Sequence, residues 1–195
     1  RIDNHNPNFI LSTYYSEIVK LFRSYKYKWF VKYNSLNFDT HSKYSFFPMH
    51  TEPEIAIQIN GRVLTNQIEV IRNIAMSLPL NHKLIVKEHP RSFGLRKVSY
   101  YKKILQIPNV YLCPLNLSVS KIIDLSSLVF TISGSVGLES IIKKKPVILL
   151  GYQDIDVFPS SMVRKVHNLF ELSKNVKNLL NNHKHDEKFL IKYIR

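Results

Sequence analysis

Three short polar clusters in this sequence combine residue types that can bind a phosphate or transfer a proton. The first is Ser133-Gly134-Ser135, which follows an apolar run and opens a segment with helical spacing, with Glu139 one helical turn further on. Backbone N–H groups and the helix dipole attract an anion to such a helix start, and glycine lets the backbone approach a phosphate closely. A helix cap built from Ser and Gly explains the same residues equally well.

The second cluster, Lys87-Glu88-His89-Pro90-Arg91, also follows an apolar run. Its histidine could donate a hydrogen bond to a phosphate, and Lys87 and Arg91 would add positive charge. A surface turn without a ligand is an equally good interpretation of this cluster taken by itself.

The third cluster, residues 48–54, places His50 close in sequence to Glu52 and Glu54. A histidine with carboxylates could act in acid–base chemistry or orient a sugar, although a polar loop ended by proline is the competing interpretation. Taken together, the three clusters predict these substrate-binding residues: His50, Glu52, Lys87, His89, Pro90, Arg91, Ser133, Gly134, Ser135 and Glu139.

The segments around these clusters alternate between short apolar runs and stretches with helical spacing. Strands are predicted over residues 44–49, 83–87, 110–113, 128–132 and 147–150, and helices over 66–77, 97–105, 118–125 and 136–142. This alternation predicts an α/β fold, a Rossmann-like doubly wound parallel sheet with helices on both faces. Such sheets bind ligands beyond the carboxyl ends of their strands, so we expect the three clusters at one edge.

The chain divides into three parts. Residues 1–43 are expected to form a helical lead-in segment, with a helix over 10–30 whose apolar side carries Ile10, Tyr14, Ile18, Leu21 and Phe22. Residues 44–170 form the predicted Rossmann-like domain. Residues 171–195 are expected to complete a helix that begins near 169 and then form a polar run and a basic tail. Because the first residue is Arg1 rather than Met, we expect a fragment of a longer protein.

The formal net charge of +14 favours anionic partners such as nucleotide phosphates, acidic glycans, anionic lipids or nucleic acid. A generally lysine-rich composition with solvated side chains would produce the same charge. The one cysteine, Cys113, lies in an apolar run, which predicts a buried, unreactive thiol and fits a reducing, cytoplasmic location. The patterns of P-loop, dinucleotide-binding and H-E-x-x-H metal sites do not occur, so neither a cofactor nor a metal is predicted.

Several motifs occur here in the order in which one protein family carries them. They are Phe46 to Glu54, Asn66-Gln67, Ile85 to Pro90, Gly94, Ile107 to Val110, Ser133 to Glu139 and Lys145-Pro146-Val147. On these motifs, residues 44–170 resemble the carboxyl-terminal half of the bacterial capsular polysaccharide biosynthesis proteins, the group that includes the capsule Kdo transferases. The chain departs from their pattern at Glu52-Pro53, Asn60-Gly61 and Asn66-Gln67, where members often carry Gln-Pro, Gly-Gly and Asp-Gln.

The resemblance implies a two-domain GT-B glycosyltransferase whose carboxyl-terminal domain binds the nucleotide-sugar donor and whose acceptor is a glycan or glycolipid. In related CMP-sugar transferases a His-Pro motif and a Ser-rich helix start hold CMP, which implies that role for His89, Pro90, Ser133 and Ser135. The family's catalytic carboxylate is expected in the amino-terminal domain, which we expect to be missing here. No catalytic residue is therefore predicted.

The donor and the class of protein leave alternatives open. A CMP-linked, Kdo-like donor is favoured, and a glycerophosphotransferase that uses CDP-glycerol on a similar fold is the alternative within the same class. A basic module that binds nucleic acid or a membrane surface is the other class, because Tyr25 to Trp29 interleaves aromatic residues with lysines. We prefer the glycosyltransferase and expect no nucleic-acid partner. Lys20 to Lys32 could hold such an enzyme at the anionic inner face of the membrane.

Overall fold

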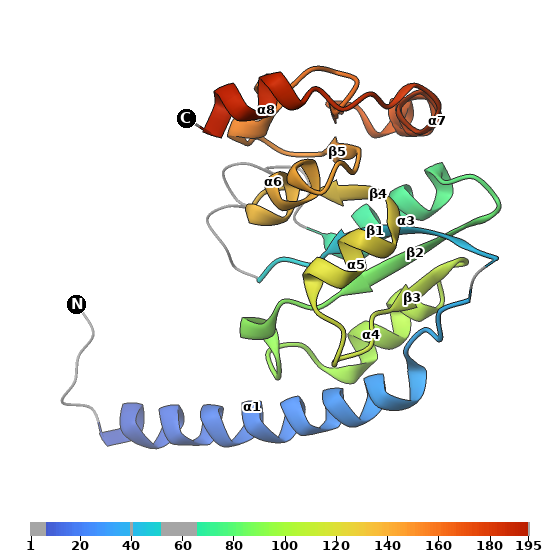
Figure 1. Ribbon diagram of the computed structural model, residues 1–195. Helices are drawn as coiled ribbons and strands as arrows, with labels where there is room; N and C mark the ends of the chain where they lie inside the picture. The colour runs from blue at the N-terminus through green and yellow to red at the C-terminus, as the bar shows by residue number, and fades with distance from the viewer. Residues whose placement is uncertain (1–6, 40, 52–65, 195) are drawn as a thin grey trace.

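Six parallel strands form a single sheet at the centre of the molecule (Figure 1). The computed structural model describes residues 7–39, 41–51 and 66–194. The strands are β1 (Lys43–Pro48), β2 (His82–Lys87), β3 (Val110–Leu112), β4 (Ser126–Thr131), β5 (Val147–Leu149) and β6 (Val163–Lys165). Their spatial order is β3-β2-β1-β4-β5-β6. The predicted doubly wound parallel sheet is confirmed.

The direction in which the chain builds the sheet reverses between β1 and β4. From β1 the chain adds β2 and then β3 on one side, and it returns to the other side of β1 to add β4, β5 and β6. Phe46 in β1 pairs with Ile85 of β2 on one side and with Val129 of β4 on the other. Because the connections leave these two strands in opposite directions, a crevice forms at their carboxyl ends.

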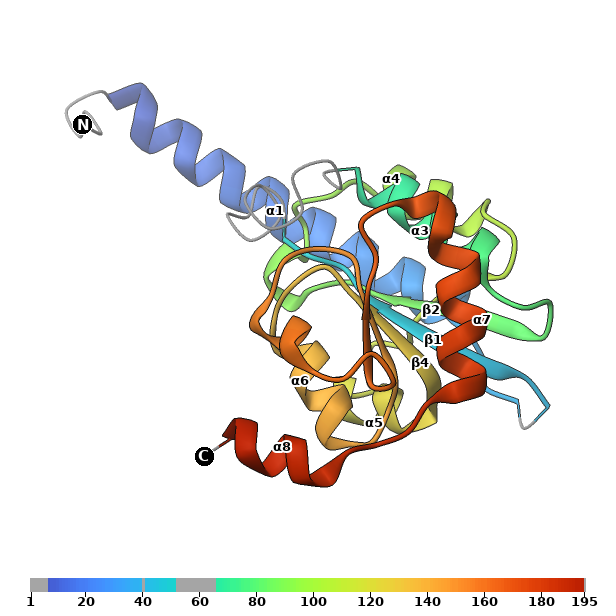
Figure 2. The same ribbon diagram turned by 90° about the horizontal axis from the view of Figure 1, so that it is seen from above.

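Helices cover both faces of the sheet (Figure 2). On one face lie α3 (Gln67–Ser77), α4 (Val98–Leu105) and α7 (Leu172–Asn182), and on the other α5 (Val119–Leu125), α6 (Ser135–Ile142) and α8 (Glu187–Ile194). Phe47 packs in the core of the first face, whereas its neighbour Phe46 packs with residues of α5 on the second. Strand side chains alternate between faces, so each central strand contributes to both cores.

A long helix, α1 (Pro7–Asn34), passes along the β3 side of the domain, and its amino-terminal half projects beyond it (Figures 1 and 2). The carboxyl-terminal half docks through the buried side chains of Tyr27, Phe30 and Val31. Gly94 permits a close approach of the two backbones, because its φ is +84° and a Cβ there would collide with the carbonyl oxygen of Lys20.

Within the described residues, the predicted strands and the four helices between them occur within about two residues of their expected ends, whereas the ends of α1 and α7 differ from the prediction by up to about four residues. Among the strands and α-helices of the described residues, two were not predicted. β6 has three residues, too few to show a period, and α8 replaces the polar and basic tail expected after residue 180. Leu190 of α8 is buried against the core of the second face, which explains why this segment is helical.

A helix, α1, does occupy most of the predicted lead-in segment, but the side expected to be its apolar side does not dock. Tyr14, Ile18, Leu21 and Phe22 are each more than half exposed. No helix in the described part of the chain is both long enough and apolar enough to cross a bilayer.

Candidate functional site

A pocket of about 200 Å³ opens at the carboxyl ends of β1, β2 and β4, where the strand order reverses. Five of the predicted site residues line it, and they come from two of the three sequence clusters: Lys87, His89, Pro90, Ser135 and Glu139. Phe46, Pro48, Met49, Glu88, Val119 and Val136 complete the lining. The parallel topology therefore brings the His-Pro turn and the start of α6 to one cavity.

The ring of His89 is held in one tautomer by its own turn. The backbone N–H of Arg91 donates to Nδ1 at 3.2 Å, and Thr51 Oγ1 lies 3.2 Å from the same nitrogen. Because Nδ1 accepts a hydrogen bond, the neutral ring carries its proton on Nε2. His89 can thus donate one hydrogen bond from Nε2. The exposed Arg91 side chain, predicted to add charge, is not part of the pocket wall.

The start of α6 forms the opposite wall. Gly134 precedes the helix with φ +96° and ψ 177°, a conformation that residues with a Cβ rarely adopt. Its carbonyl oxygen accepts a hydrogen bond of 2.6 Å from Gln153 Nε2, which fixes the loop. The Ser135 hydroxyl donates to Glu139 Oε1 at 2.7 Å. The first N–H groups of any α-helix lack partners within the helix, so this wall can donate to an anion.

Beneath His89, a buried carboxylate anchors the turn. Glu88 is almost fully buried, and its Oε1 accepts a 2.7 Å hydrogen bond from the backbone N–H of His89. Arg96 Nη1 donates to both carboxylate oxygens at 2.9 and 2.8 Å, and the Tyr101 hydroxyl donates to Oε2 at 2.7 Å. Burial, together with the negative charge of Glu88, raises the pKa of Tyr101 far above its ordinary value, so its hydroxyl stays protonated.

The loop after β1 is clamped through the backbone of His50. Gln67 Oε1 accepts from the His50 N–H at 2.7 Å, Gln67 Nε2 donates to the His50 carbonyl at 3.0 Å, and Arg96 Nη2 donates to that carbonyl at 2.8 Å. His50 was predicted as a substrate-binding residue, but its buried side chain is not part of the pocket wall. Its predicted neighbour Glu52 lies outside the described residues.

Lys87 lies in the pocket wall but already has a partner. Its Nζ donates to the Leu117 carbonyl at 2.9 Å and lies 3.9 Å from the Sγ of Cys113. Burial raises the pKa of Cys113 to about 11, an effect that nearby Lys87 partly opposes. The thiol therefore stays protonated near neutral pH, as the sequence predicts for an unreactive cysteine.

The remaining two predicted residues, Ser133 and Gly134, line a second hollow of about 660 Å³ on the other side of the loop. This hollow also contains Asp154 and Asp156, an Asp-x-Asp pair. The expectation that the sequence carries no acidic pair of this spacing, one argument for a metal-independent donor, is therefore wrong. Asp156 Oδ2 lies 2.7 Å from Lys165 Nζ, so its charge is partly balanced. Among the described residues, no three His, Cys, Asp or Glu side chains gather as metal ligands.

Comparison with solved structures finds the same fold in several sugar enzymes. KpsC, a β-Kdo 2,7-transferase from Thermosulfurimonas dismutans, matches with a TM-score of 0.54 and 16% sequence identity over 92% of this chain and 66% of that chain. The UDP-GlcNAc 2-epimerase of Methanocaldococcus jannaschii, in complex with UDP-GlcNAc and UDP, matches with a TM-score of 0.54 and 22% identity over 79% of this chain and 44% of that chain.

A third structure, the spinosyn rhamnosyltransferase SpnG complexed with thymidine diphosphate, has a TM-score of 0.50 and 14% identity over 80% of this chain and 40% of that chain. At these low identities, the structural similarity establishes a shared fold. The chain spans at most about two thirds of the length of the three proteins.

No curated protein sequence matches the chain. A family model does match it: the model for capsule polysaccharide biosynthesis proteins aligns with residues 3–156, which include both walls of the pocket at the strand reversal. On this match over most of its length, the chain belongs to the capsule polysaccharide biosynthesis protein family.

Proposed function

We propose that this chain is the donor-binding half of a glycosyltransferase that acts in capsule polysaccharide synthesis. The observation that carries the proposal is the juxtaposition of His89 and the start of α6 in one pocket at the strand reversal. Family membership supports a role in capsule polysaccharide synthesis. The fold shared with a Kdo transferase and a rhamnosyltransferase supports glycosyl transfer as the reaction.

In the proposed reaction, the pocket holds the phosphate that joins the nucleotide to the sugar. As the bond between the anomeric carbon and the phosphate oxygen breaks, the phosphate gains negative charge. The His89 Nε2–H and the amides at the start of α6 donate to that charge, and donors fixed before the reaction need no reorganisation. The base that accepts the proton of the acceptor hydroxyl is assigned to no residue of this chain.

Within this proposal we favour a CMP-linked, Kdo-like donor over a sugar linked through a diphosphate. The pocket is small, and His89 and Lys87 are the side chains in its described lining that can donate to a phosphate from an imidazole or ammonium group. Lys87 is partly engaged by the Leu117 carbonyl. One phosphate needs fewer such partners than two, which supports the CMP-linked donor.

Calorimetric titration with CMP, UDP and CDP-glycerol, each with and without Mg²⁺, tests the donor. We expect CMP to bind most tightly and Mg²⁺ to leave its affinity unchanged. Tighter binding of UDP or a requirement for Mg²⁺ would overturn the choice of CMP, and tighter CDP-glycerol binding would favour a glycerophosphotransferase. If no nucleotide binds, the donor-binding role itself is wrong.

We further propose peripheral attachment to the inner membrane face through the exposed apolar side of α1. Six exposed apolar residues of this helix form one stripe: Leu11, Tyr14, Tyr15, Ile18, Leu21 and Phe22. At 3.6 residues per turn these positions fall within a sector of about 120°, opposite the docking face around Tyr27 and Val31. Arg23 and Lys26 follow along the same helix, so apolar insertion and attraction to anionic lipid would act together.

Vesicle sedimentation tests this attachment. Vesicles rich in phosphatidylglycerol should retain the protein, and the variant Ile18→Ser/Phe22→Ser should lose most of that binding. Met76→Ser/Leu80→Ser is the control, because it removes two even more exposed apolar side chains elsewhere. Attachment through α1 would be contradicted if vesicle binding did not depend on the content of anionic lipid. It would also be contradicted if Ile18→Ser/Phe22→Ser bound vesicles as well as the native sequence does.

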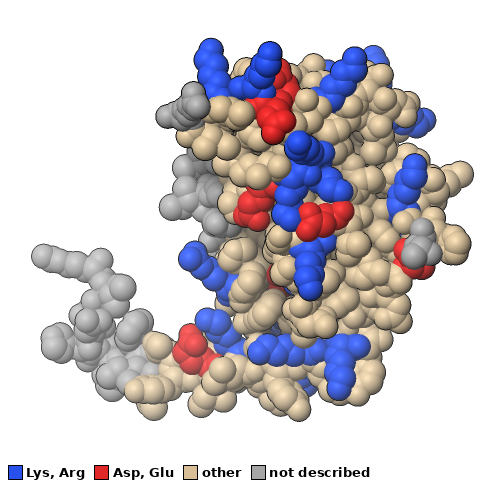
Figure 3. Space-filling view, in the orientation of Figure 1, with Lys and Arg blue, Asp and Glu red and all other residues tan. Residues whose placement is uncertain are grey.

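The distribution of surface charge gives less support to a nucleic-acid-binding module than the pocket gives to a glycosyltransferase. On the face shown in Figure 3, Lys and Arg side chains are spread over the molecule and interspersed with acidic ones. A nucleic-acid interface is expected to concentrate basic residues into a patch or stripe.

A further inference from the structure

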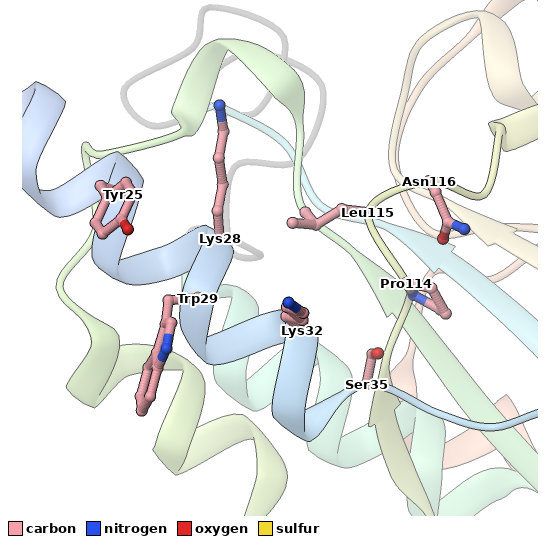
Figure 4. Close-up of a pocket in the computed structure, with 8 residues that line it drawn as sticks. All are labelled: Tyr25, Lys28, Trp29, Lys32, Ser35, Pro114, Leu115 and Asn116. Carbon is pink, nitrogen blue, oxygen red and sulfur yellow. The ribbon is translucent and has the colours of Figure 1, made fainter.

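Another pocket, of about 540 Å³, lies between the docked half of α1 and the loop after β3 (Figure 4). Its volume is within the usual range of small-ligand sites, about 300–1,000 Å³. The helix contributes Tyr25, Lys28, Trp29 and Lys32, and the other lining residues are Ser35, Pro114, Leu115 and Asn116. This pocket plays no part in the donor site described above.

Its walls combine aromatic rings with uncompensated positive charge. Tyr25 and Trp29 are 72% and 60% exposed, and the Trp29 ring packs 5.0 Å from that of Tyr33. Among the residues that the structure describes, no acidic side chain lines the pocket, and none forms an ion pair with Lys28 or Lys32. Glu17, the only acidic residue of α1, lies near Lys20 instead.

This combination of groups selects a particular ligand chemistry. Aromatic faces pack against the C–H faces of sugar rings, and ammonium groups attract carboxylates or phosphates as point charges. A neutral glycan would leave the lysines unused, and a small inorganic anion would leave the aromatic surface uncovered. A saccharide that carries carboxylates would use both the lysines and the aromatic surface.

The pocket also lies next to the proposed donor site. The segment after β3 lines both cavities, with Asn116 of the loop in this pocket and Val119, the first residue of α5, in the donor pocket. Three residues of chain span at most about 11 Å, so the two cavities are neighbours. The loop is tied to the donor site by the hydrogen bond from Lys87 to the Leu117 carbonyl. A saccharide held here would lie close to the reacting sugar.

We infer that the pocket between α1 and the loop after β3 binds an acidic saccharide of the growing acceptor chain. The role as an acceptor site rests on the proposed function, whereas the binding of an acidic saccharide does not. Lys28 and Lys32 pair with its carboxylates, and Tyr25 and Trp29 pack against its rings.

Trp29 is the only tryptophan in the sequence, so its fluorescence reports directly on this pocket. The probe is a tetramer of α2,8-linked sialic acid, with maltotetraose as the neutral saccharide of equal length. We expect a saturable change in Trp29 fluorescence with the acidic probe that weakens as salt is added, and no change with maltotetraose. The variant Lys28→Gln/Lys32→Gln should weaken binding about tenfold, as expected for two exposed ion pairs.

Lys102→Gln/Lys103→Gln on α4 is the control, because it removes the same charge from another exposed surface. Equal weakening by both variants would overturn the inference, since it would show attraction to net charge alone. A response of Trp29 to phosphatidylglycerol vesicles but not to the tetramer would also overturn it, in favour of a membrane-facing surface.

A parallel titration with CMP separates this inference from the proposed function. CMP binding without a Trp29 response to the tetramer overturns only the acidic-saccharide site. A Trp29 response in a protein that binds no nucleotide supports the saccharide site and removes its role as an acceptor site.

Discussion

Glu88 and Arg96 form a buried ion pair beneath the candidate donor site, with Arg96 Nη1 2.8 Å from Glu88 Oε2 and side chains that are 0% and 8% exposed. Through this pair Arg96 reaches the carbonyl of His50, and Glu88 holds the backbone of His89. The ion pair therefore connects the loops that follow β1 and β2.

Replacing Glu88 by Gln should destabilise the fold by about 3 kcal/mol, because it removes a buried carboxylate that accepts hydrogen bonds from Arg96, Tyr101 and the His89 N–H. Urea denaturation measures the change. Glu69→Gln is the matched control, since Glu69 pairs with Arg72 on the surface, where both side chains are about half exposed. That change should cost less than about 1 kcal/mol. Similar losses in the two variants would show that Glu88 has no special structural role.

Replacing His89 by Ala should weaken CMP binding by about 1.5–3 kcal/mol, or roughly 10- to 150-fold, if Nε2 donates to a charged phosphate. Calorimetry measures the affinity. His41→Ala is the control, because His41 is an exposed residue before the amino end of β1, at the opposite edge of the sheet. Unchanged CMP affinity in His89→Ala would remove His89 from the site.

Replacing Gly94 by Ala should loosen the docking of α1. A Cβ at this position would collide with the carbonyl oxygen of Lys20, in addition to the strain of φ +84°. We expect faster tryptic cleavage at Lys20 and Arg23. Gly134→Ala is the control, because its φ of +96° is also positive but a Cβ there meets no atom within 4 Å. It should strain the donor loop and leave the cleavage of α1 unchanged. Equal cleavage in both variants would contradict the backbone contact.

The stability of the protein should fall as the pH drops below about 6.5, in part because of His82. Burial, and secondly the positive charge of Lys43, lower the pKa of His82 below its ordinary value of 6.5. The unfolded chain therefore binds a proton at a higher pH than the folded chain does, so the contribution is fully present above about 6.5 and is lost on acidification.

Urea unfolding of His82→Gln at pH values of about 7.5 and 5.5 should show a smaller loss of stability than the native sequence shows. His183 has a pKa lowered by burial and by His185, so some pH dependence should remain in this variant. An identical loss in variant and native protein would show that His82 is not responsible.

Much of the fold could be predicted from the sequence because its signals are local. Runs such as 128–132 and 147–150 are too apolar and β-branched for exposed loops, and the segments between them repeat at helical spacing. The end of the chain shows where this reasoning stops. Residues 187–194 look like a basic tail, yet they form α8, because Leu190 meets a core built by β5 and β6. Only the tertiary structure supplies that partner.

For the candidate site, too, local sequence signals predict one part and tertiary contacts decide the rest. The sequence by itself determined the residue types at the strand ends, and therefore the chemistry of His89 and Ser135. Their meeting in one pocket depends on β1 lying between β2 and β4, which no local pattern encodes. The tertiary structure alone also decided that Gln67 holds His50 through its backbone. It likewise decided that the apolar stripe of α1 from Leu11 to Phe22 stays exposed. Both outcomes depend on contacts between segments far apart in sequence, whereas helical and strand spacing report only on neighbours along the chain.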